Sequence, residues 1–145
     1  MSAANIYLTF DGNCEDVFNF YKSVFGGEFL SVNRFKEVPP DQGMEIGKED
    51  EEKIMHVTLP IGKDSVLMGS DTAGGYGGPI VQGNNFSISV NADSKEDADK
   101  FFTALSAGGA VKMPMADTFW GSYFGMLTDK FGINWMISFD HGQRE

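Results

Sequence analysis

The chain has only two histidines and one cysteine, so few side chains could act as a general base, a nucleophile or a transition-metal ligand. His56 lies in the segment 54–59, where apolar and polar residues alternate, so strand periodicity turns its imidazole away from the packing face. Histidine is the side-chain type that changes charge near neutral pH, so it can act as a general acid, as a general base or as a hydrogen-bond donor to an anion. A structural histidine bonded to Thr58 or to a backbone carbonyl explains the same pattern. His56 is therefore the candidate catalytic residue, with both interpretations open.

The other reactive side chains offer weaker cases. Cys14 begins a helical pattern, and a helix N-terminus can lower the pKa of a thiol. No second histidine is placed to partner it, since His141 lies in a tail that we expect to be exposed. Arg34 could clamp a carboxylate or phosphate as a bidentate donor, or could be a solvated residue at a sheet edge. Asp71 could orient His56, but capping a turn is the favoured interpretation.

Strand alternation also predicts a polar face suited to a ligand. Ile6, Leu8 and Phe10 share a packing face, and the polar residues between them point the other way. The second half repeats this split, so we expect both halves to line one cavity with polar and aromatic side chains for a small organic ligand. Large aromatics near Gly121 could form a stacking wall there or serve as core anchors. The candidate ligand-binding residues are Asn5, Tyr7, Thr9, Thr58, Met68, Asn85, Ser87, Trp120, Ser122, Phe124 and Met136.

The elements that position these residues form an internal repeat of two copies. The strand pattern 6–10 returns at 86–90, an offset of 80, and the glycine pair 26–27 returns at 108–109, an offset of 82. We predict one domain, residues 1–145, made of module one (about 3–72), a linker (about 73–84) and module two (about 85–140).

Periodicity assigns each module the order βαβββ. Helices are expected at 14–25, ended by Gly26 and Gly27, and at 94–107, with Ser94 as N-cap. A mobile loop is expected from Pro39 to Lys53, the Gly-rich stretch 74–79 serves as the linker, and Asp129 belongs to a hairpin turn. The predicted strands are 5–10, 29–35, 54–59, 65–70, 85–90, 110–113, 122–128 and 134–139. This is an α+β fold.

Composition narrows the partners and the location. With 11 basic against 21 acidic residues the net charge is −10, which repels nucleic acids and anionic membranes at long range. The start of the chain lacks the basic and apolar runs of a signal peptide, and no window suits a membrane span. A single cysteine allows no internal disulfide. We therefore predict a cytoplasmic protein with neither nucleic acid nor membrane as a partner.

Four motifs give this pattern a family resemblance. They are Tyr7–Cys14 (YLTFDGNC), Phe20–Gly27 (FYKSVFGG), Lys53–His56 (KIMH) and Phe119–Trp135 (FWGSYFGMLTDKFGINW), and together they span nearly the entire chain. The chain resembles the vicinal oxygen chelate superfamily of glyoxalase I, bleomycin- and fosfomycin-resistance proteins and extradiol dioxygenases. It is most similar to the PhnB-like branch, also called the 3-demethylubiquinone-9 3-methyltransferase domain family. That resemblance implies tandem modules curled around a cavity, with helices on the convex side, and a homodimer.

The resemblance also sets expectations about chemistry. Enzymes of the superfamily often bind a divalent metal through one residue from each of four strands. Here those positions fall near Asn5, Met68, Asn85 and Met136, which are poor ligands for such a metal, so no metal and no cofactor is expected. Methyltransferase activity has no support, because the βαβββ order lacks the parallel sheet and glycine turn that usually hold S-adenosylmethionine.

Three classes of function therefore stay open. The first is a metal-free protein that binds a small molecule. The second is a lyase- or oxygenase-type enzyme, either metal-dependent or using His56 as acid or base. The third is an association protein whose cavity is filled by its own side chains.

Overall fold

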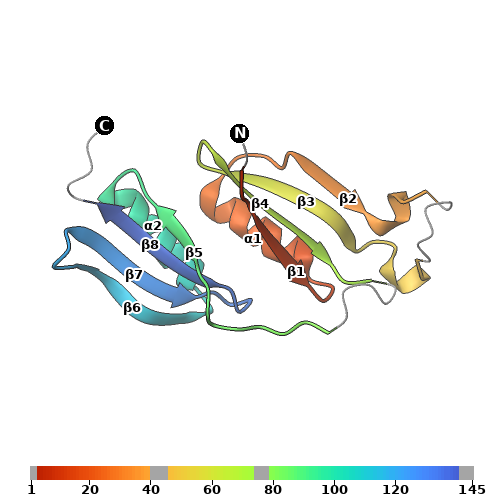
Figure 1. The fold of residues 1–145 in the computed structure, drawn as a ribbon. Helices are drawn as coiled ribbons and strands as arrows, with labels where there is room; N and C mark the ends of the chain where they lie inside the picture. The colour runs from red at the N-terminus through yellow and green to blue at the C-terminus, as the bar shows by residue number, and fades with distance from the viewer. Residues whose placement is uncertain (1–2, 40–45, 74–78, 141–145) are drawn as a thin grey trace. The chain divides into compact units, whose positions relative to one another are not determined.

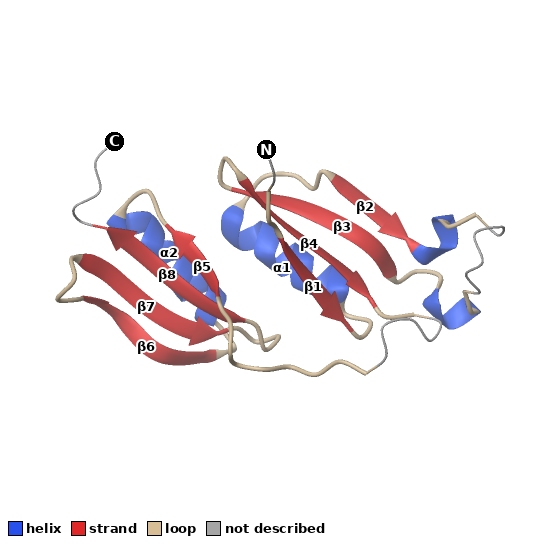
Figure 2. Ribbon diagram, viewed as in Figure 1, coloured by secondary structure: helices blue, strands red, loops and turns tan. Residues whose placement is uncertain are grey.

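The structure, a computed structural model, describes residues 3–39, 46–73 and 79–140 of the 145-residue chain. The chain divides into two compact units, Met1–Val81 and Gln82–Glu145, which we call unit one and unit two. Each unit contains one α-helix and one four-stranded mixed sheet in the order βαβββ (Figures 1 and 2). The predicted α+β fold with tandem βαβββ modules is confirmed.

Unit one begins with β1 and α1 and then adds an antiparallel meander. The sheet order is β1-β4-β3-β2, with β1 parallel to β4 and the other neighbours antiparallel. Two short 3-10 helices, η1 (Phe35–Glu37) and η3 (Lys48–Asp50), follow β2. The main elements are β1 (Ile6–Phe10), α1 (Cys14–Phe25), β2 (Ser31–Arg34), β3 (Ile54–Ile61) and β4 (Ser65–Asp71).

Helix α1 covers one face of this sheet with the apolar stripe that its sequence predicts. Phe18 and Tyr21 are buried in the helix and Leu59 and Leu67 in the sheet beneath it. A Cβ at Gly69 of β4 would lie 2.6 Å from Cε1 of Phe18, so only glycine lets this helix pack so closely. The helix ends as predicted, because the following two glycines, at 26 and 27, have φ of 80° and 84°.

Unit two repeats this arrangement. Its sheet order is β5-β8-β7-β6, again with one parallel pair, between β5 and β8. Helix α2 begins after Ser94, whose Oγ accepts a hydrogen bond of 3.0 Å from the Asp97 N–H, so the predicted N-cap is confirmed. The core of the unit includes Trp135, Leu105 and Ile137. The elements are β5 (Ile88–Asn91), α2 (Lys95–Ser106), β6 (Ala110–Asp117), β7 (Ser122–Thr128) and β8 (Asn134–Asp140).

The strand registers correct the predicted repeat alignment. Ile6 pairs with Leu67, and Ile88 pairs with Trp135. The two copies of the first strand therefore correspond at an offset of 82, from residue 6 to residue 88, and the predicted offset of 80 is wrong. A shift of two residues leaves every side chain on the same face, so alternation alone could not detect it.

Several predicted boundaries also change. The strand predicted at 85–90 begins at Ile88, so Asn85 and Ser87 precede β5. Strand β6 continues through Pro114 to Asp117. Proline has no backbone N–H to donate, and an edge strand such as β6 tolerates this because one of its sides has no partner strand. Parts of the predicted loop (40–45) and linker (74–78), and His141, lie outside the described residues.

Candidate ligand-binding faces

Each sheet has a face turned away from its helix, which we call the open face. In unit one, paired residues form a row across all four strands. Tyr7 lies opposite Met68, Met68 opposite Thr58, and Thr58 opposite Ser31. Neighbours in such a row have Cβ atoms about 4.5–5.5 Å apart, so a phenol, a thioether and two hydroxyls lie side by side. The predicted positions Tyr7, Thr58 and Met68 are thus brought together.

His56 lies beside this row. Its ring centroid is 5.9 Å from that of Tyr7, at an interplanar angle of 42°, and Asn33 of β2 is its cross-strand partner. The Thr58 hydroxyl lies within hydrogen-bond distance of the Ser31 hydroxyl (3.4 Å) rather than contacting the imidazole. Tyr7 is 48% exposed and His56 is partly exposed. A molecule on the open face could therefore reach both rings.

The Asp71 carboxylate accepts hydrogen bonds from backbone N–H groups rather than orienting His56. Its Oδ1 accepts hydrogen bonds of 2.9 Å from the N–H groups of Gly12 and Cys14, and its Oδ2 accepts one of 2.9 Å from Ile54 N–H. These bonds join the end of β4 to the start of α1 and the start of β3. The carboxylate is an anchor between elements, a wider role than the turn cap that we predicted.

A β-bulge changes the faces at the start of β3. Asn33 pairs with His56, but the next residue of β2, Arg34, pairs with Ile54, so Met55 is the extra residue. Strict alternation would place Ile54 on the open face with His56. Instead Ile54 is 2% exposed and belongs to the core, because the bulge breaks the alternation there.

The Arg34 guanidinium is occupied by groups of the chain itself. Its Nη1 and Nη2 donate to the two carboxylate oxygens of Glu15 at 3.1 and 2.7 Å, and Nη1 also donates to the Glu52 carbonyl at 2.7 Å. The hydrogen bond to Arg34 holds the pKa of Glu15 below its ordinary value. Arg34 is thus an ion-paired residue of unit one and not a free clamp for an anion.

Cys14 is not a reactive thiol. It is fully buried, and burial, followed by the nearby charge of Asp71, raises its pKa far above the ordinary value. The prediction that the helix N-terminus could lower this pKa is wrong, because desolvation outweighs the helix dipole.

The open face of unit two has a different chemistry. The row that corresponds to Tyr7–Met68–Thr58–Ser31 is Ser89, Met136, Met126 and Met113. In the next row Phe124 lies opposite Ser138, at the position that corresponds to His56 in unit one, as the sequence predicted. Two further thioethers, Met126 and Met113, thus replace the hydroxyls of Thr58 and Ser31, and a phenyl ring replaces the imidazole.

Aromatic rings that precede the start of β7 extend this face. Trp120 makes an edge contact with Phe124, with ring centroids 5.9 Å apart, and Phe119 makes one with Trp120 at 5.1 Å. Phe119 is 97% and Trp120 57% exposed, so neither is a core anchor. Ser122, another predicted ligand residue, is buried, and its N–H donates to Thr118 Oγ1.

Trp135 and Asp129 are structural, and Asp129 belongs to the hairpin turn that we predicted. Asp129 Oδ1 accepts hydrogen bonds from the N–H groups of Phe131 and Ile133, which form the predicted hairpin turn. Its Oδ2 accepts a 2.9 Å hydrogen bond from Nε1 of the buried Trp135.

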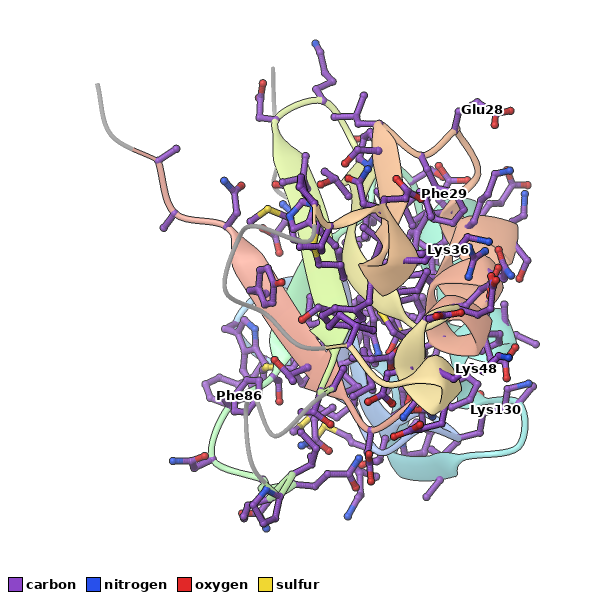
Figure 3. The ribbon with its side chains drawn as sticks, turned by 90° about the vertical axis from the view of Figure 1, so that its right-hand side faces the viewer. Glu28, Phe29, Lys36, Lys48, Phe86 and Lys130 are labelled. Atoms are coloured by element: carbon purple, nitrogen blue, oxygen red, sulfur yellow. The ribbon has the colours of Figure 1, made fainter. Side chains whose placement is uncertain are left out.

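Besides Trp120, three predicted ligand residues lie outside the strands. Asn5 precedes β1 and is exposed, and Asn85 and Ser87 lie in the segment before β5. In the same segment Phe86 is 56% exposed, and Figure 3 shows it and Lys130 on opposite sides of unit two. Thr9 remains on β1, opposite Ser70. Whether these residues and both open faces line one cavity stays a prediction.

Sequence reasoning missed the contribution of the two edge strands. Ser31 and Asn33 of β2 and Met113 of β6 complete the cross-strand rows, as does Met126 of β7, two residues beyond the predicted Phe124. Polar residues alternate along 31–33, which was the available signal, but pairing partners are set by register and bulges rather than by local pattern.

The residues of the two rows do not fit a zinc-, nickel- or iron-type centre. Such ions take imidazole, carboxylate or thiolate ligands, whereas the rows present a phenol, hydroxyls and uncharged thioethers. Among the described residues, no three His, Cys, Asp or Glu side chains are grouped so that they could hold a metal ion. No helix in the described part of the chain is long and apolar enough to cross a membrane.

A duplicated βαβββ module with an open sheet face opposite each helix defines a class of tandem-module α+β proteins. The chain belongs to the Glyoxalase/Bleomycin resistance protein/Dioxygenase superfamily, whose family model matches residues 4–137. It is 30% identical over 141 residues to Protein YjdN of Escherichia coli K12, covering 91% of each chain.

Two solved structures are similar over nearly the whole chain. Protein PA1353 from Pseudomonas aeruginosa is 37% identical with a TM-score of 0.80, covering 95% of this chain and 98% of that one. A PhnB protein from Bacillus cereus is 26% identical with a TM-score of 0.73, covering 95% and 99%. These likenesses agree with the predicted PhnB-like resemblance.

Proposed function

We propose that this PhnB-like protein binds a small organic ligand on the open face of unit one, without a divalent metal. The observation that carries the proposal is the row of Tyr7, Met68, Thr58 and Ser31, with the His56 ring beside Tyr7. Hydroxyl, phenol and imidazole groups orient a ligand by hydrogen bonds, and ring faces add stacking.

The charges on this face favour an uncharged ligand. Arg34, the basic residue of β2, is paired with Glu15 and Glu52. Within the described residues the His56 imidazole has its ring contact with Tyr7 and no ion pair. Arg34 is therefore not free to neutralise a strongly anionic ligand, and the net charge of −10 disfavours one at long range.

A screen of neutral organic molecules by thermal shift tests the proposal. A ligand at 100 times its dissociation constant should stabilise the protein by about 2.7 kcal/mol. Calorimetry of each hit should then show binding weakened about tenfold or more, or about 1.4 kcal/mol, in His56→Gln and in Tyr7→Phe. Tyr123→Phe is the matched control, because its phenol donates to Asp99 of α2 on the helix side.

Binding that survives EDTA supports the metal-free form of the proposal. Binding lost with EDTA and restored by a divalent cation contradicts it and favours the metal-dependent enzyme. If His56→Gln and Tyr7→Phe both bind every hit as the unchanged protein does, the ligand does not lie on this face.

The contact between Tyr7 and His56 also favours a second candidate, a metal-free enzyme of lyase type. An imidazole on an accessible face beside a phenol can accept a proton from a bound molecule or return one. Turnover of a hit that disappears in His56→Gln, while binding persists, would distinguish this enzyme from a binding protein.

We also propose a cytoplasmic location, which the single buried thiol supports.

A further inference from the structure

The three methionines on the open face of unit two are direct neighbours on adjacent strands. Met126 of β7 pairs with Met136 of β8 on one side and with Met113 of β6 on the other. Met126 and Met136 pair in a regular part of the ladder, so their side chains share one face of the sheet, with Cβ atoms about 4.5–5.5 Å apart. The register of β6 shifts on both sides of Met113, so Met113 is placed in this row by its own pairing with Met126 and not by alternation along β6. Met113 is 43% exposed and the other two are partly exposed. The row is therefore a continuous strip of thioether side chains.

Methionine geometry allows the three sulfur atoms to meet. The outer strands are two interstrand spacings apart, about 10 Å, and each methionine is unbranched with three rotatable bonds. Met113 and Met136 can therefore lean inward from both sides over Met126, and their sulfurs can surround one ion. Met115, the next methionine of β6, does not belong to this group. It lies on the helix face of the sheet, beside Gly125 and Phe102.

The donor set selects the kind of ion. Thioether sulfur is soft and carries no charge, so it binds hard or borderline divalent cations poorly and favours Cu(I). We propose that Met113, Met126 and Met136 form a site for a soft monovalent cation, Cu(I), on the open face of unit two. Ser89 ends the row with a hydroxyl. The site does not depend on the ligand proposed for unit one.

Met68 in unit one is the matched control. It stands at the position that corresponds to Met136, on the same kind of open face and similarly exposed. Its neighbours in the row are Tyr7 and Thr58, neither of which is a thioether. One thioether should hold the ion far more weakly than three.

Ag(I) is the probe, because it resembles Cu(I) as a soft monovalent cation and does not change oxidation state during the titration. The full-length chain carries Cys14→Ala throughout, so that the buried thiol cannot take up silver in chains that unfold during the titration. Chloride-free calorimetry and native mass spectrometry should show one Ag(I) per chain. Met126→Leu, which conserves side-chain volume, should weaken binding about tenfold or more, or about 1.4 kcal/mol. Met68→Leu should leave the affinity unchanged.

A second measurement needs no substitution in the row. With ¹³C-methyl-labelled methionine, Ag(I) should shift the methyl signals of Met113, Met126 and Met136 together and leave that of Met68 in place. The proposal is overturned if these three signals do not move, or if Met126→Leu and Met68→Leu weaken binding equally. A row that only forms an apolar wall would give that result.

Discussion

At the scale of single residues, two buried carboxylates each hold several donors. Asp129 accepts hydrogen bonds from donors of its own hairpin, two to six residues away. An Asp shortly before a glycine is a sequence pattern that predicts such a turn. Asp71 instead takes N–H groups 59, 57 and 17 residues away. No local pattern could predict those partners, because the strand order of the sheet brings them together.

The substitution Asp71→Asn tests the anchor. Asparagine replaces one carboxylate oxygen with an NH₂ group, which accepts no hydrogen bond, so either the Ile54 N–H or the N–H groups of Gly12 and Cys14 are left unsatisfied. We expect a loss of about 2–3 kcal/mol in the free energy of unfolding, measured by urea denaturation. Asp11→Asn is the control, since Asp11 has an exposed contact with the Thr72 hydroxyl at 3.4 Å, and should cost under about 0.5 kcal/mol. Equal losses in the two variants would contradict the anchoring role.

At the scale of elements, the sequence predicts those whose periodicity is strong and unbroken. Helix α1 and strand β7 have the predicted bounds, and the alternation of β3 and β4 places Thr58 and Met68 on the open face. The start of β5 was misplaced because a two-residue shift preserves alternation. The bulge that buries Ile54 was missed because it depends on the partner strand.

The close contact between α1 and β4 gives a test at this scale. Gly69→Ala places a methyl group against the Phe18 ring and 2.9 Å from the Leu8 carbonyl oxygen. Overpacking of this kind should lower the free energy of unfolding by about 1–3 kcal/mol. Gly83→Ala is the control, since its nearest contact would be an ordinary 3.7 Å, and its loss should stay under about 0.5 kcal/mol.

A double-mutant cycle then identifies the clash. Phe18→Leu makes room beside residue 69, so the losses of Phe18→Leu and Gly69→Ala should combine less than additively. Additive losses would mean that the methyl group strains another part of the sheet.

At the scale of the whole molecule, the two modules keep one topology and differ in the chemistry of their open faces. The row Tyr7–Met68–Thr58–Ser31 can donate and accept hydrogen bonds, and its counterpart Ser89–Met136–Met126–Met113 is mainly soft and apolar. Corresponding positions such as His56 and Phe124 have diverged while the strands around them have not. The shared topology follows from the apolar residues under each helix, which leaves the open faces free to differ.

Several large apolar side chains remain exposed within the separate units, and we propose that the chain forms a homodimer. Val81 is 90%, Leu30 68% and Phe119 97% exposed, and side chains of this type favour burial in an interface. Sedimentation at micromolar concentration should give a mass of twice 15.9 kDa. Phe119→Ser and Leu30→Ser are a matched pair, and the one that returns the mass to 15.9 kDa identifies the face that is buried. A single 15.9 kDa species for the unchanged chain would contradict the homodimer.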